Sequence, residues 1–330
     1  MTVLVIGDAN ADASAALERF PREGDDAAIR ALGWGSGGAA VNVATAVALL
    51  GMGARLLARI GKDPAGDVAL SAARAAGVDL GAIQRDEVHS TGLCFAAVSP
   101  SGERTFFSHR GANRALELPP ASDLFRGIRW LHLSGHALLE DRQRDTSLAL
   151  AREASARGVP VSLDLCLPLV RTHRTDVLDL SPSLAVLFAN ELEIAALLPS
   201  AAGDPVENAI GSLEKAGVPL VAAKLGARGS MLSDRGARHV LPALPVDARD
   251  TTGSGDAYVA GFVVARLRGA PPEVCGRLGN ALGALVATRP GAASALPTGA
   301  ELRAFLAHHA ALAELSVLSS APGEPVRRSE

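Results

Sequence analysis

The chain has 330 residues, enough for one large domain or two modest ones. Hydrophobic residues make up 48% of it and charged residues 20%, so the chain can bury a core and is too apolar to be disordered. The net charge is −3, and no basic run is longer than the pair Arg327-Arg328. This charge pattern argues against nucleic acid or an anionic membrane as the main partner, whereas a small anionic ligand needs only a local site.

The three cysteines, Cys94, Cys166 and Cys275, are far apart and odd in number. They offer neither metal-ligand spacing nor a disulfide framework, which favours a reducing compartment. Residues 1–7 lack a basic leader region and predict a first strand. The apolar stretch 37–54 contains Asn42 and several glycines, so it predicts a buried helix and not a membrane span. We therefore expect a soluble, cytoplasmic protein.

Short β-type runs alternate with Ala- and Leu-rich helical stretches along most of the chain. The predicted strands cover residues 3–6, 55–60, 130–133, 159–163, 185–188 and 220–223. The predicted helices cover residues 39–50, 66–76, 143–157, 191–198 and 204–216. This alternation predicts an α/β fold: a doubly wound, mostly parallel sheet flanked by helices on both faces.

Two regions break the alternation. Residues 10–34 contain one extended segment at 27–32, and residues 82–110 resemble antiparallel strands at 93–98 and 104–108 joined by a turn. Neither region is long enough to be stable alone, so we expect them to form one small sheet, either a substrate lid or an edge extension. The main domain is predicted to span residues 1–318, and residues 319–330 to form a frayed tail.

A polar, glycine-rich turn at residues 250–256, with the sequence DTTGSGD, runs directly into an apolar helical pattern. Gly253 and Gly255 allow successive backbone N–H groups to point at one place, and Ser254 between them is small. The helix that follows adds its own unpaired N–H groups and the positive end of its dipole. The segment therefore predicts an anion site built from backbone atoms.

Asp256 stands at the start of that helix, where a carboxylate has two interpretations. It can act as a helix cap, a role that stabilises by about 0.5–2 kcal/mol. Beside a bound phosphate it would repel the ligand, unless it accepts a proton from an attacking hydroxyl group. Phosphoryl transfer needs this combination of an anion cradle and a base that positions the nucleophile.

Other nucleotide and hydrolase motifs are absent or weak in the sequence. It contains neither a P-loop nor the G-x-S-x-G of a nucleophile elbow. The pattern G-x-G-x-x-G occurs at Gly33, Gly35 and Gly38, but the segment before it carries Arg30 and is not the apolar strand of a dinucleotide fold. A dinucleotide site is therefore disfavoured.

Several sequence blocks in the same order resemble the ribokinase family, the PfkB carbohydrate kinases, from about residue 2 to residue 309. They include GSGGAAVN at 35–42, IGKDPAG at 60–66, GAN at 111–113, NELE at 190–193, LGARG at 225–229 and DTTGSGD at 250–256. The resemblance implies the doubly wound domain with a β-sheet lid. It also implies an acceptor site near the lid, ATP along the carboxyl edge of the sheet, and Mg²⁺.

The resemblance also implies roles for individual residues. Asp256 matches the catalytic base, and Gly253, Ser254 and Gly255 match the anion hole. Asn190 and Glu193 match an N-x-x-E motif that helps to place Mg²⁺ through water, although an ordinary capping box has the same spacing. Residues that match the nucleotide site are Lys224, Gly226, Gly229 and Asn280. Residues that match loops holding a monovalent cation such as K⁺ in some members are Asp250 and Thr252, with the stretch 289–294.

On the acceptor side, five residues match those that hold sugar hydroxyls: Asn10, Asp12, Gly37, Gly38 and Asn42. Ala39 stands where ribokinase itself has a lysine, and residues 132–136 lack the acidic ligand of ribokinase, so the acceptor is a sugar or sugar-like molecule of unspecified type. His109, Arg110 and His136 are further candidates for the pocket, and Arg110 would suit an acidic sugar.

Two alternatives remain at this stage. The first is a nucleoside kinase on the same scaffold, for which Trp34, Phe106 and Phe107 are the aromatic residues near the lid. The second is a catalytically silent sugar-binding protein, which the intact Asp256 and N-x-x-E motif argue against. Pairing of two lids into a homodimer is also expected from the resemblance.

Overall fold

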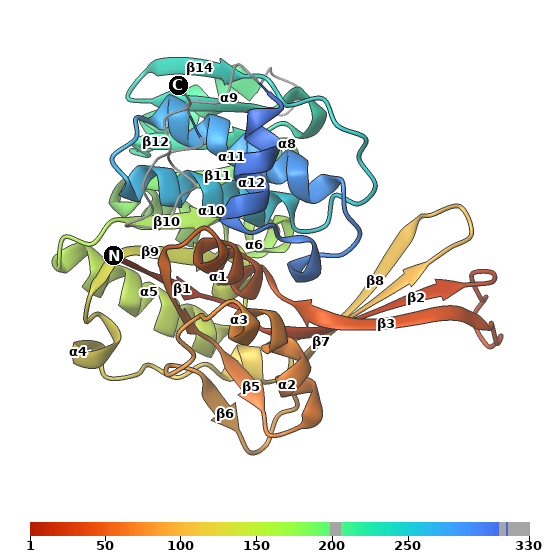
Figure 1. Ribbon diagram of the computed structural model, residues 1–330. Helices are drawn as coiled ribbons and strands as arrows, with labels where there is room; N and C mark the ends of the chain where they lie inside the picture. Colours follow the sequence, from red (N-terminus) through yellow and green to blue (C-terminus); the bar gives the residue numbers. More distant parts are fainter. Residues whose placement is uncertain (199–205, 310–314, 316–330) are drawn as a thin grey trace.

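The structure is a computed structural model, and it describes residues 1–198, 206–309 and 315. Its main body is an eight-stranded sheet of order β14-β13-β12-β11-β10-β9-β1-β4 (Figure 1). These strands are β1 (Thr2–Ile6), β4 (Gly53–Leu57), β9 (Ile128–Ser134), β10 (Val161–Asp164), β11 (Val186–Asn190), β12 (Leu220–Lys224), β13 (Ser230–Asp234) and β14 (Ala237–Leu241). The strands from β12 to β4 are parallel, whereas β13 and β14 pair antiparallel at one edge.

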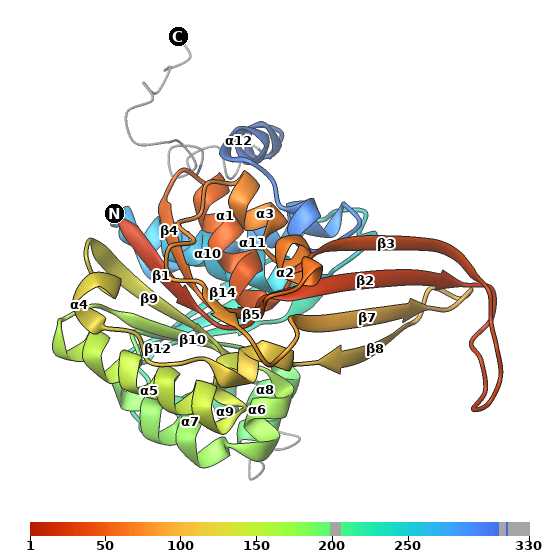
Figure 2. The ribbon, with the colours of Figure 1, turned by 90° about the horizontal axis from the view of Figure 1, so that it is seen from below.

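Helices cover both faces of this sheet, as Figure 2 shows. One face carries α1 (Ala39–Leu49), α2 (Pro64–Ala69), α3 (Ser71–Ala75), α10 (Ser254–Leu267), α11 (Pro272–Ala287) and α12 (Gly299–Ala307). The other carries α4 (Ala121–Leu124), α5 (Asp141–Ala156), α6 (Leu167–Thr172), α7 (Arg174–Leu180), α8 (Glu191–Leu197) and α9 (Val206–Lys215). Short 3-10 turns lie at Gly111–Ala115, Gly135–Leu138, Ser181–Ser183, Gly226–Arg228 and Ala293–Ala295. The predicted doubly wound fold is confirmed.

The core consists of two apolar layers, one on each side of the sheet. In β1, Val3 and Val5 contribute to one layer while Leu4 and Ile6 contribute to the other, because side chains alternate along a strand. Both layers are needed for a parallel sheet, whose strands are buried on two faces. Within the described part of the chain, no helix is long and apolar enough to cross a membrane. The apolar stretch 37–54 instead contains the buried helix α1.

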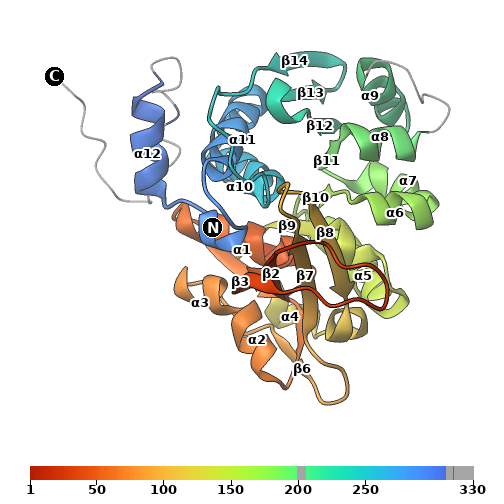
Figure 3. The same cartoon turned by 90° about the vertical axis from the view of Figure 1, so that its right-hand side faces the viewer.

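A second sheet of four strands, called the lid here, projects from the body (Figures 1 and 2) and points toward the viewer in Figure 3. Its order is β3-β2-β7-β8, with β2 (Asn10–Leu17), β3 (Ile29–Gly37), β7 (Gly92–Val98) and β8 (Arg104–His109). The predicted hairpin of β7 and β8 is confirmed. The strand β2 was not predicted, because its sequence NADASAAL has little β propensity.

Three further details differ from the prediction. The extended segment expected at 27–32 is the first part of a longer strand, β3. The short strand β6 (Gln84–Asp86) pairs with β5 (Arg59–Gly61) and does not join the lid. The edge strands β13 and β14 were also missed. The predicted tail at 319–330 and the first residues of the predicted helix 204–216 lie outside the described ranges.

Candidate active site

Several polar side chains gather along the carboxyl ends of the parallel strands. Asp164, Asn190 and Lys224 are the last residues of β10, β11 and β12. Asp8 and Asn10 follow β1. Open α/β sheets bind ligands at this edge, because the loops there converge on one crevice. The fold therefore places the candidate residues of both halves of the chain around a common site.

The start of helix α10 forms the floor of this crevice. Its N-cap is Gly253, whose φ of 79° is in the left-handed region that favours glycine. The Ser254 N–H donates to the Thr251 carbonyl at 3.1 Å, so within the predicted anion hole this amide is used by the turn itself. The next N–H groups belong to the first turn, where amides have no partner inside the helix. They supply the positive end of the helix that an anion would meet.

Asp256 lies in this first turn and is half-buried. One oxygen, Oδ2, accepts a hydrogen bond of 2.7 Å from the side-chain amide of Asn42. Burial raises the pKa of Asp256 to about 7, while the bond from Asn42 acts in the opposite direction. A carboxylate with this pKa is suited to accept a proton near neutral pH.

Lys224 and Asp164 form an ion pair beside the start of helix α10. The Lys224 Nζ donates to Asp164 Oδ1 at 2.5 Å. Burial opposes the charge on Lys224, but the attraction of Asp164 and Glu193 outweighs it, so its pKa is raised. Burial also raises the pKa of Asp164, which Lys224 partly offsets. A Cβ built on Gly255 would lie 3.4 Å from the Lys224 Nζ, which places this amine against the glycine-rich turn.

Asn190 and Glu193 form a complete capping box at the start of α8. The Asn190 N–H donates to Glu193 Oε2 at 2.7 Å, and the Glu193 N–H donates to Asn190 Oδ1 at 2.9 Å. The N-x-x-E motif therefore forms the ordinary capping box that its spacing also allows. Glu193 is buried, and this burial raises its pKa to about 7. Among the described residues there is no cluster of three or more His, Cys, Asp or Glu that could hold a metal ion.

A cavity of about 330 Å³ lies on the nucleotide side of α10. The four residues predicted for the nucleotide site line it, namely Lys224, Gly226, Gly229 and Asn280, together with Ser254 and Gly255, whereas Asn190 of the N-x-x-E motif does not. The Asn280 Nδ2 donates to the carbonyls of Leu241 and Pro242, at 3.0 and 3.2 Å, so this amide also anchors the segment after β14.

The acceptor side is built around Asp12 on lid strand β2. A Cβ on Gly37 would lie 2.1 Å from the Asp12 carboxylate, and one on Gly38 would lie 2.3 Å from the Asp8 carbonyl. Both positions therefore require glycine, and Gly38 also has a φ of 93°. Among the described side chains, Asp12 Oδ1 and Asn42 Oδ1 are buried without a hydrogen-bond partner. Burial raises the pKa of Asp12 to about 6. These atoms suit a ligand rich in hydroxyl groups.

A second cavity, of about 340 Å³, lies between the lid and the loops at 250–252 and 290–294. Asp12, Trp34, Phe106 and Arg104 line it from the lid. Asp250, Thr252 and Gly291 line it from the body. The expectation that the small sheet covers a ligand site agrees with this arrangement.

Asn113 and Arg110 support the acceptor side from behind. The Asn113 Nδ2 donates to Asn10 Oδ1 at 2.8 Å, and the Ala9 N–H donates to Asn113 Oδ1 at 2.9 Å. The Arg110 Nη2 donates to Asp8 Oδ1 at 3.1 Å, and also to the carbonyl of His136 and to a glutamine on α5. Arg110 is thus held by protein groups, whereas the exposed His109 contacts Ser90.

Sequence reasoning missed the functional positions of Asp164, Asn113 and Arg104. Asn113 carried a signal, since GAN was one of the resembling blocks, but no role was assigned to it. Asp164 ends a predicted strand, and a polar residue at a strand end was the available clue. Arg104 had no signal, because its partners Asp250 and Thr252 are 146 and 148 residues away.

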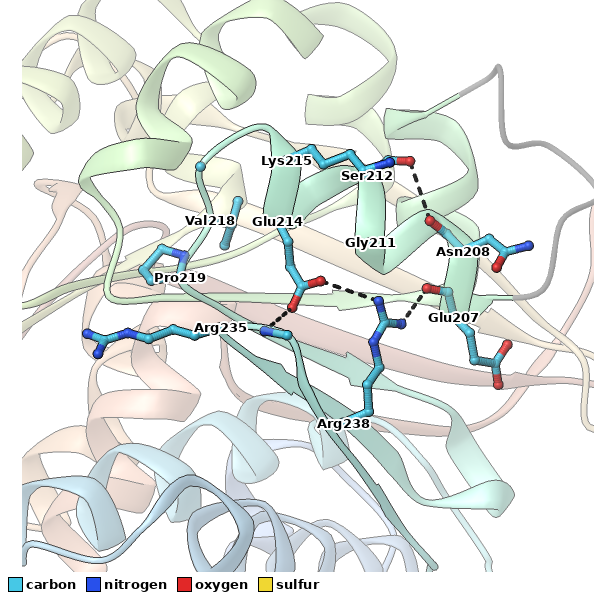
Figure 4. A pocket seen from close by; sticks show the side chains of 12 residues that line it. Glu207, Asn208, Gly211, Ser212, Glu214, Lys215, Val218, Pro219, Arg235 and Arg238 are labelled. Carbon is cyan, nitrogen blue, oxygen red and sulfur yellow. Dashed lines mark hydrogen bonds and ion pairs between the residues drawn. The ribbon is translucent and has the colours of Figure 1, made fainter.

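A larger hollow than either of these cavities lies elsewhere, between α9 and the β13–β14 hairpin (Figure 4). It measures about 860 Å³ and contains none of the predicted site residues. Its polar groups bond to one another: Glu214 accepts hydrogen bonds from Ser233, from the Gly236 N–H and from Arg238. At this hollow Glu214 is thus held by neighbouring groups, and none of the residues predicted for the site lies there.

Comparison with known proteins agrees with this geometry. Residues 2–299 match the family described as pfkB family carbohydrate kinase. An ATP-dependent ribose-1-phosphate kinase of Halopiger xanaduensis is 34% identical over 304 residues, which cover 92% of this chain and 97% of that protein.

Two solved structures have the same fold. A ribokinase of Arabidopsis thaliana, complexed with ribose and ATP, has a TM-score of 0.80 and 26% identity, covering 92% of this chain and 98% of that one. An aminoimidazole riboside kinase of Salmonella enterica, complexed with aminoimidazole riboside and an ATP analogue, has a TM-score of 0.74 and 26% identity, covering 93% and 99%. Its sheet and lid agree with those of these proteins, and the chain belongs to the pfkB family of carbohydrate kinases.

Proposed function

We propose that this protein transfers the γ-phosphoryl group of ATP to a hydroxymethyl group of a sugar or sugar-like molecule, with Asp256 as the general base. The observation that carries the proposal is the position of Asp256 between two sites. Its neighbour Gly255 lines the nucleotide cavity. Its bonding partner Asn42 follows Gly37 and Gly38, and a Cβ on Gly37 would meet the carboxylate of Asp12, which lines the cavity under the lid.

Asp256 removes the proton of the acceptor hydroxyl as the oxygen attacks the γ-phosphorus, and the bond to the β-phosphate oxygen breaks. Its raised pKa leaves a large fraction of it unprotonated and basic at neutral pH. The N–H groups of Gly253 and Gly255 and the positive end of α10 stabilise the charge on the transferring group. The lid excludes water, which limits hydrolysis of ATP.

The residues proposed to hold ATP are those that line the nucleotide cavity, namely Lys224, Gly226, Gly229 and Asn280. Asn190 and Glu193 would hold Mg²⁺ through water, since Mg²⁺ keeps most of its waters and accepts carboxylate oxygen. When bound, Mg²⁺ neutralises charge on the phosphates. K⁺ at Asp250 and Thr252 is not part of this proposal, because the Arg104 guanidinium lies 2.6 Å from Asp250 Oδ1.

A second candidate acceptor is a nucleoside, and one observation favours it. Trp34 and Phe106 line the same cavity as Asp12, so an aromatic base could stack on the lid while its sugar contacts Asp12. The test is ADP release with ribose, ribose 1-phosphate, fructose and adenosine, for the wild type and Phe106→Ala. A nucleoside kinase would lose activity in this variant for adenosine alone, whereas a sugar kinase would prefer the free sugars in both proteins.

We also propose that two copies pair through their lids. The support is a set of exposed apolar side chains on lid strands: Ile29, Leu32, Trp34, Phe106 and Phe107. Sedimentation of the wild type and Leu32→Glu tests this pairing, because a monomer in both proteins would contradict it. The cytoplasm is the proposed location, since it supplies ATP and keeps the three free thiols reduced.

A further inference from the structure

Arg104, at the start of lid strand β8, reaches across the lid cavity to the loop that precedes the anion hole. Its Nη1 donates to Asp250 Oδ1 at 2.6 Å and to Thr252 Oγ1 at 2.5 Å. Thr252 is followed directly by Gly253, the N-cap of α10. One lid side chain therefore contacts the segment that shapes the phosphate end of the site.

Asp250 is held from several sides, and Arg104 brings it a positive charge. The Thr252 N–H and hydroxyl donate to its Oδ1 at 3.0 and 2.7 Å, and the Gly291 N–H donates to its Oδ2 at 2.8 Å. The Asp250 side chain is 4% exposed, and a buried carboxylate is costly without a positive partner. Although burial raises it, the pKa of Asp250 is held well below its usual value by Arg104 and these donors.

A monovalent cation does not fit this loop as it stands. Asp250 Oδ1 and Thr252 Oγ1 both contact the Arg104 guanidinium, and Asp250 Oδ2 accepts a hydrogen bond from the Gly291 N–H. A cation bound to the same oxygens would stand within a few ångströms of a second positive charge, and the two would repel each other. An arginine cannot relieve this repulsion by losing its proton, because it stays charged at all relevant pH values.

We propose that Arg104 is a positioning residue that supplies, from the lid, the positive charge that a monovalent cation would otherwise supply to the loop at 250–252. Resting on the proposed kinase function, this inference couples two events. Closure of the lid over the acceptor brings Arg104 to Asp250, and the same contact fixes Thr252 and the turn that begins at Gly253. The anion hole is then ordered only when the lid is closed.

The same contact joins the two walls of the cavity between the lid and the loops at 250–252 and 290–294. Arg104 lines it together with Asp12, Trp34 and Phe106 from the lid, while Asp250 and Gly291 line the opposite wall. The pair Arg104–Asp250 therefore bridges the two walls.

The test compares Arg104→Met with Arg30→Met, a matched lid variant whose exposed arginine pairs at 3.4 Å with Glu18, the residue after β2. Acceptor-dependent ADP release is measured at constant ionic strength with K⁺, with a large organic cation, and with added guanidinium. We expect less than about a twofold effect of K⁺ on the wild type and on Arg30→Met. In Arg104→Met we expect kcat to fall roughly 10- to 100-fold and to recover with guanidinium or K⁺.

A second readout needs no turnover, so it separates this inference from the proposed function. Thermal unfolding is followed in K⁺ and in the organic cation. K⁺ should raise the Tm of Arg104→Met and leave the wild type unchanged, because only a vacated charge site binds the ion. Strong activation or stabilisation of the wild type by K⁺ would overturn the inference, as would an Arg104→Met protein that behaves like Arg30→Met. If the wild type shows no turnover although K⁺ raises the Tm of Arg104→Met alone, the result would contradict the proposed kinase function and not this inference.

Discussion

The side-chain amide of Asn42 donates a hydrogen bond of 2.7 Å to the carboxylate of Asp256, 214 residues further along the chain. Asn42 belongs to α1, which begins after the glycines of the acceptor segment, and Asp256 belongs to the first turn of α10. Because the amide donates to the charged form, it lowers the pKa of a carboxylate that burial raises. Asn42 thus lowers the pKa of the proposed base and orients its carboxylate.

Removal of the carboxylate should abolish most catalysis without loss of the fold. In Asp256→Asn we expect kcat to fall by on the order of 10²–10⁴, because the amide cannot accept the proton. Steady-state kinetics and circular dichroism of the same sample check this. A folded variant with less than about a tenfold loss would assign Asp256 to a capping role.

Asp256 should also make stability depend on pH. Its pKa in the folded protein is about 7, above the ordinary 3.8, so the folded state favours the protonated form. Its contribution is fully present below the ordinary value and is lost as pH rises through about 7. Asp256→Asn should therefore melt a few degrees higher than the wild type at pH about 8, and the difference should shrink at pH about 4. A difference in Tm that does not depend on pH would contradict a raised pKa of the buried Asp256 carboxyl group.

Asn42→Ala should move the pH dependence of the rate. Without the donated hydrogen bond the pKa of Asp256 rises further, so the acidic limb of kcat/KM shifts to higher pH. The expected size is on the order of one pH unit, and a pH–rate profile measures it. A lower rate with an unchanged limb would mean that Asn42 positions the acceptor and does not influence the base.

Two glycines of one strand provide a matched pair for the acceptor site. A Cβ at Gly37 would overlap the Asp12 carboxylate at 2.1 Å, whereas a Cβ at Gly33 meets nothing within 4 Å. Gly37→Ala should raise the acceptor KM by on the order of tenfold or more, because Asp12 must move, and should leave the KM for ATP nearly unchanged. Gly33→Ala should have normal values of both constants. Equal effects of the two substitutions on the acceptor KM would contradict a role of Asp12 in binding the acceptor.

The pair Lys224–Asp164 allows a structural role to be separated from a catalytic one. Lys224→Met leaves a buried carboxylate without its partner, so we expect a loss of roughly 3–5 kcal/mol in the free energy of unfolding. The double variant Lys224→Met/Asp164→Leu should recover most of that stability. If Lys224 contacts the phosphates, kcat/KM for ATP should remain low in the double variant. Recovery of both stability and kcat/KM would make the pair purely structural.

The periodic parts of the fold were predictable because their residues follow local rules. Apolar runs such as those of β1 and β10 predicted buried parallel strands, and the turn at 99–102 predicted a hairpin. Strand β2 was not predictable, because NADASAAL resembles a helical or loop sequence and becomes a strand only by pairing with β3 and β7. In this case tertiary pairing outweighs local propensity.

The site was predictable where a motif carried it and not where long-range contacts made it. The motif DTTGSGD at residues 250–256 predicted the anion turn and the position of Asp256 from local sequence alone. The bonds from Asn42 to Asp256, from Lys224 to Asp164 and from Arg104 to Asp250 join residues 60 to 214 positions apart. No periodicity encodes such pairs, because they depend on which strands become neighbours in the sheet.

The most direct test of the proposed kinase is acceptor-dependent ADP release by the wild type and Asp256→Asn across the acceptor panel, with Mg²⁺ present. The account predicts turnover with at least one sugar or nucleoside in the wild type. It also predicts a loss of on the order of 10² or more in the variant, with ATP binding retained. Wild-type ATP binding without turnover on any acceptor of the panel, or full turnover in the variant, would contradict it.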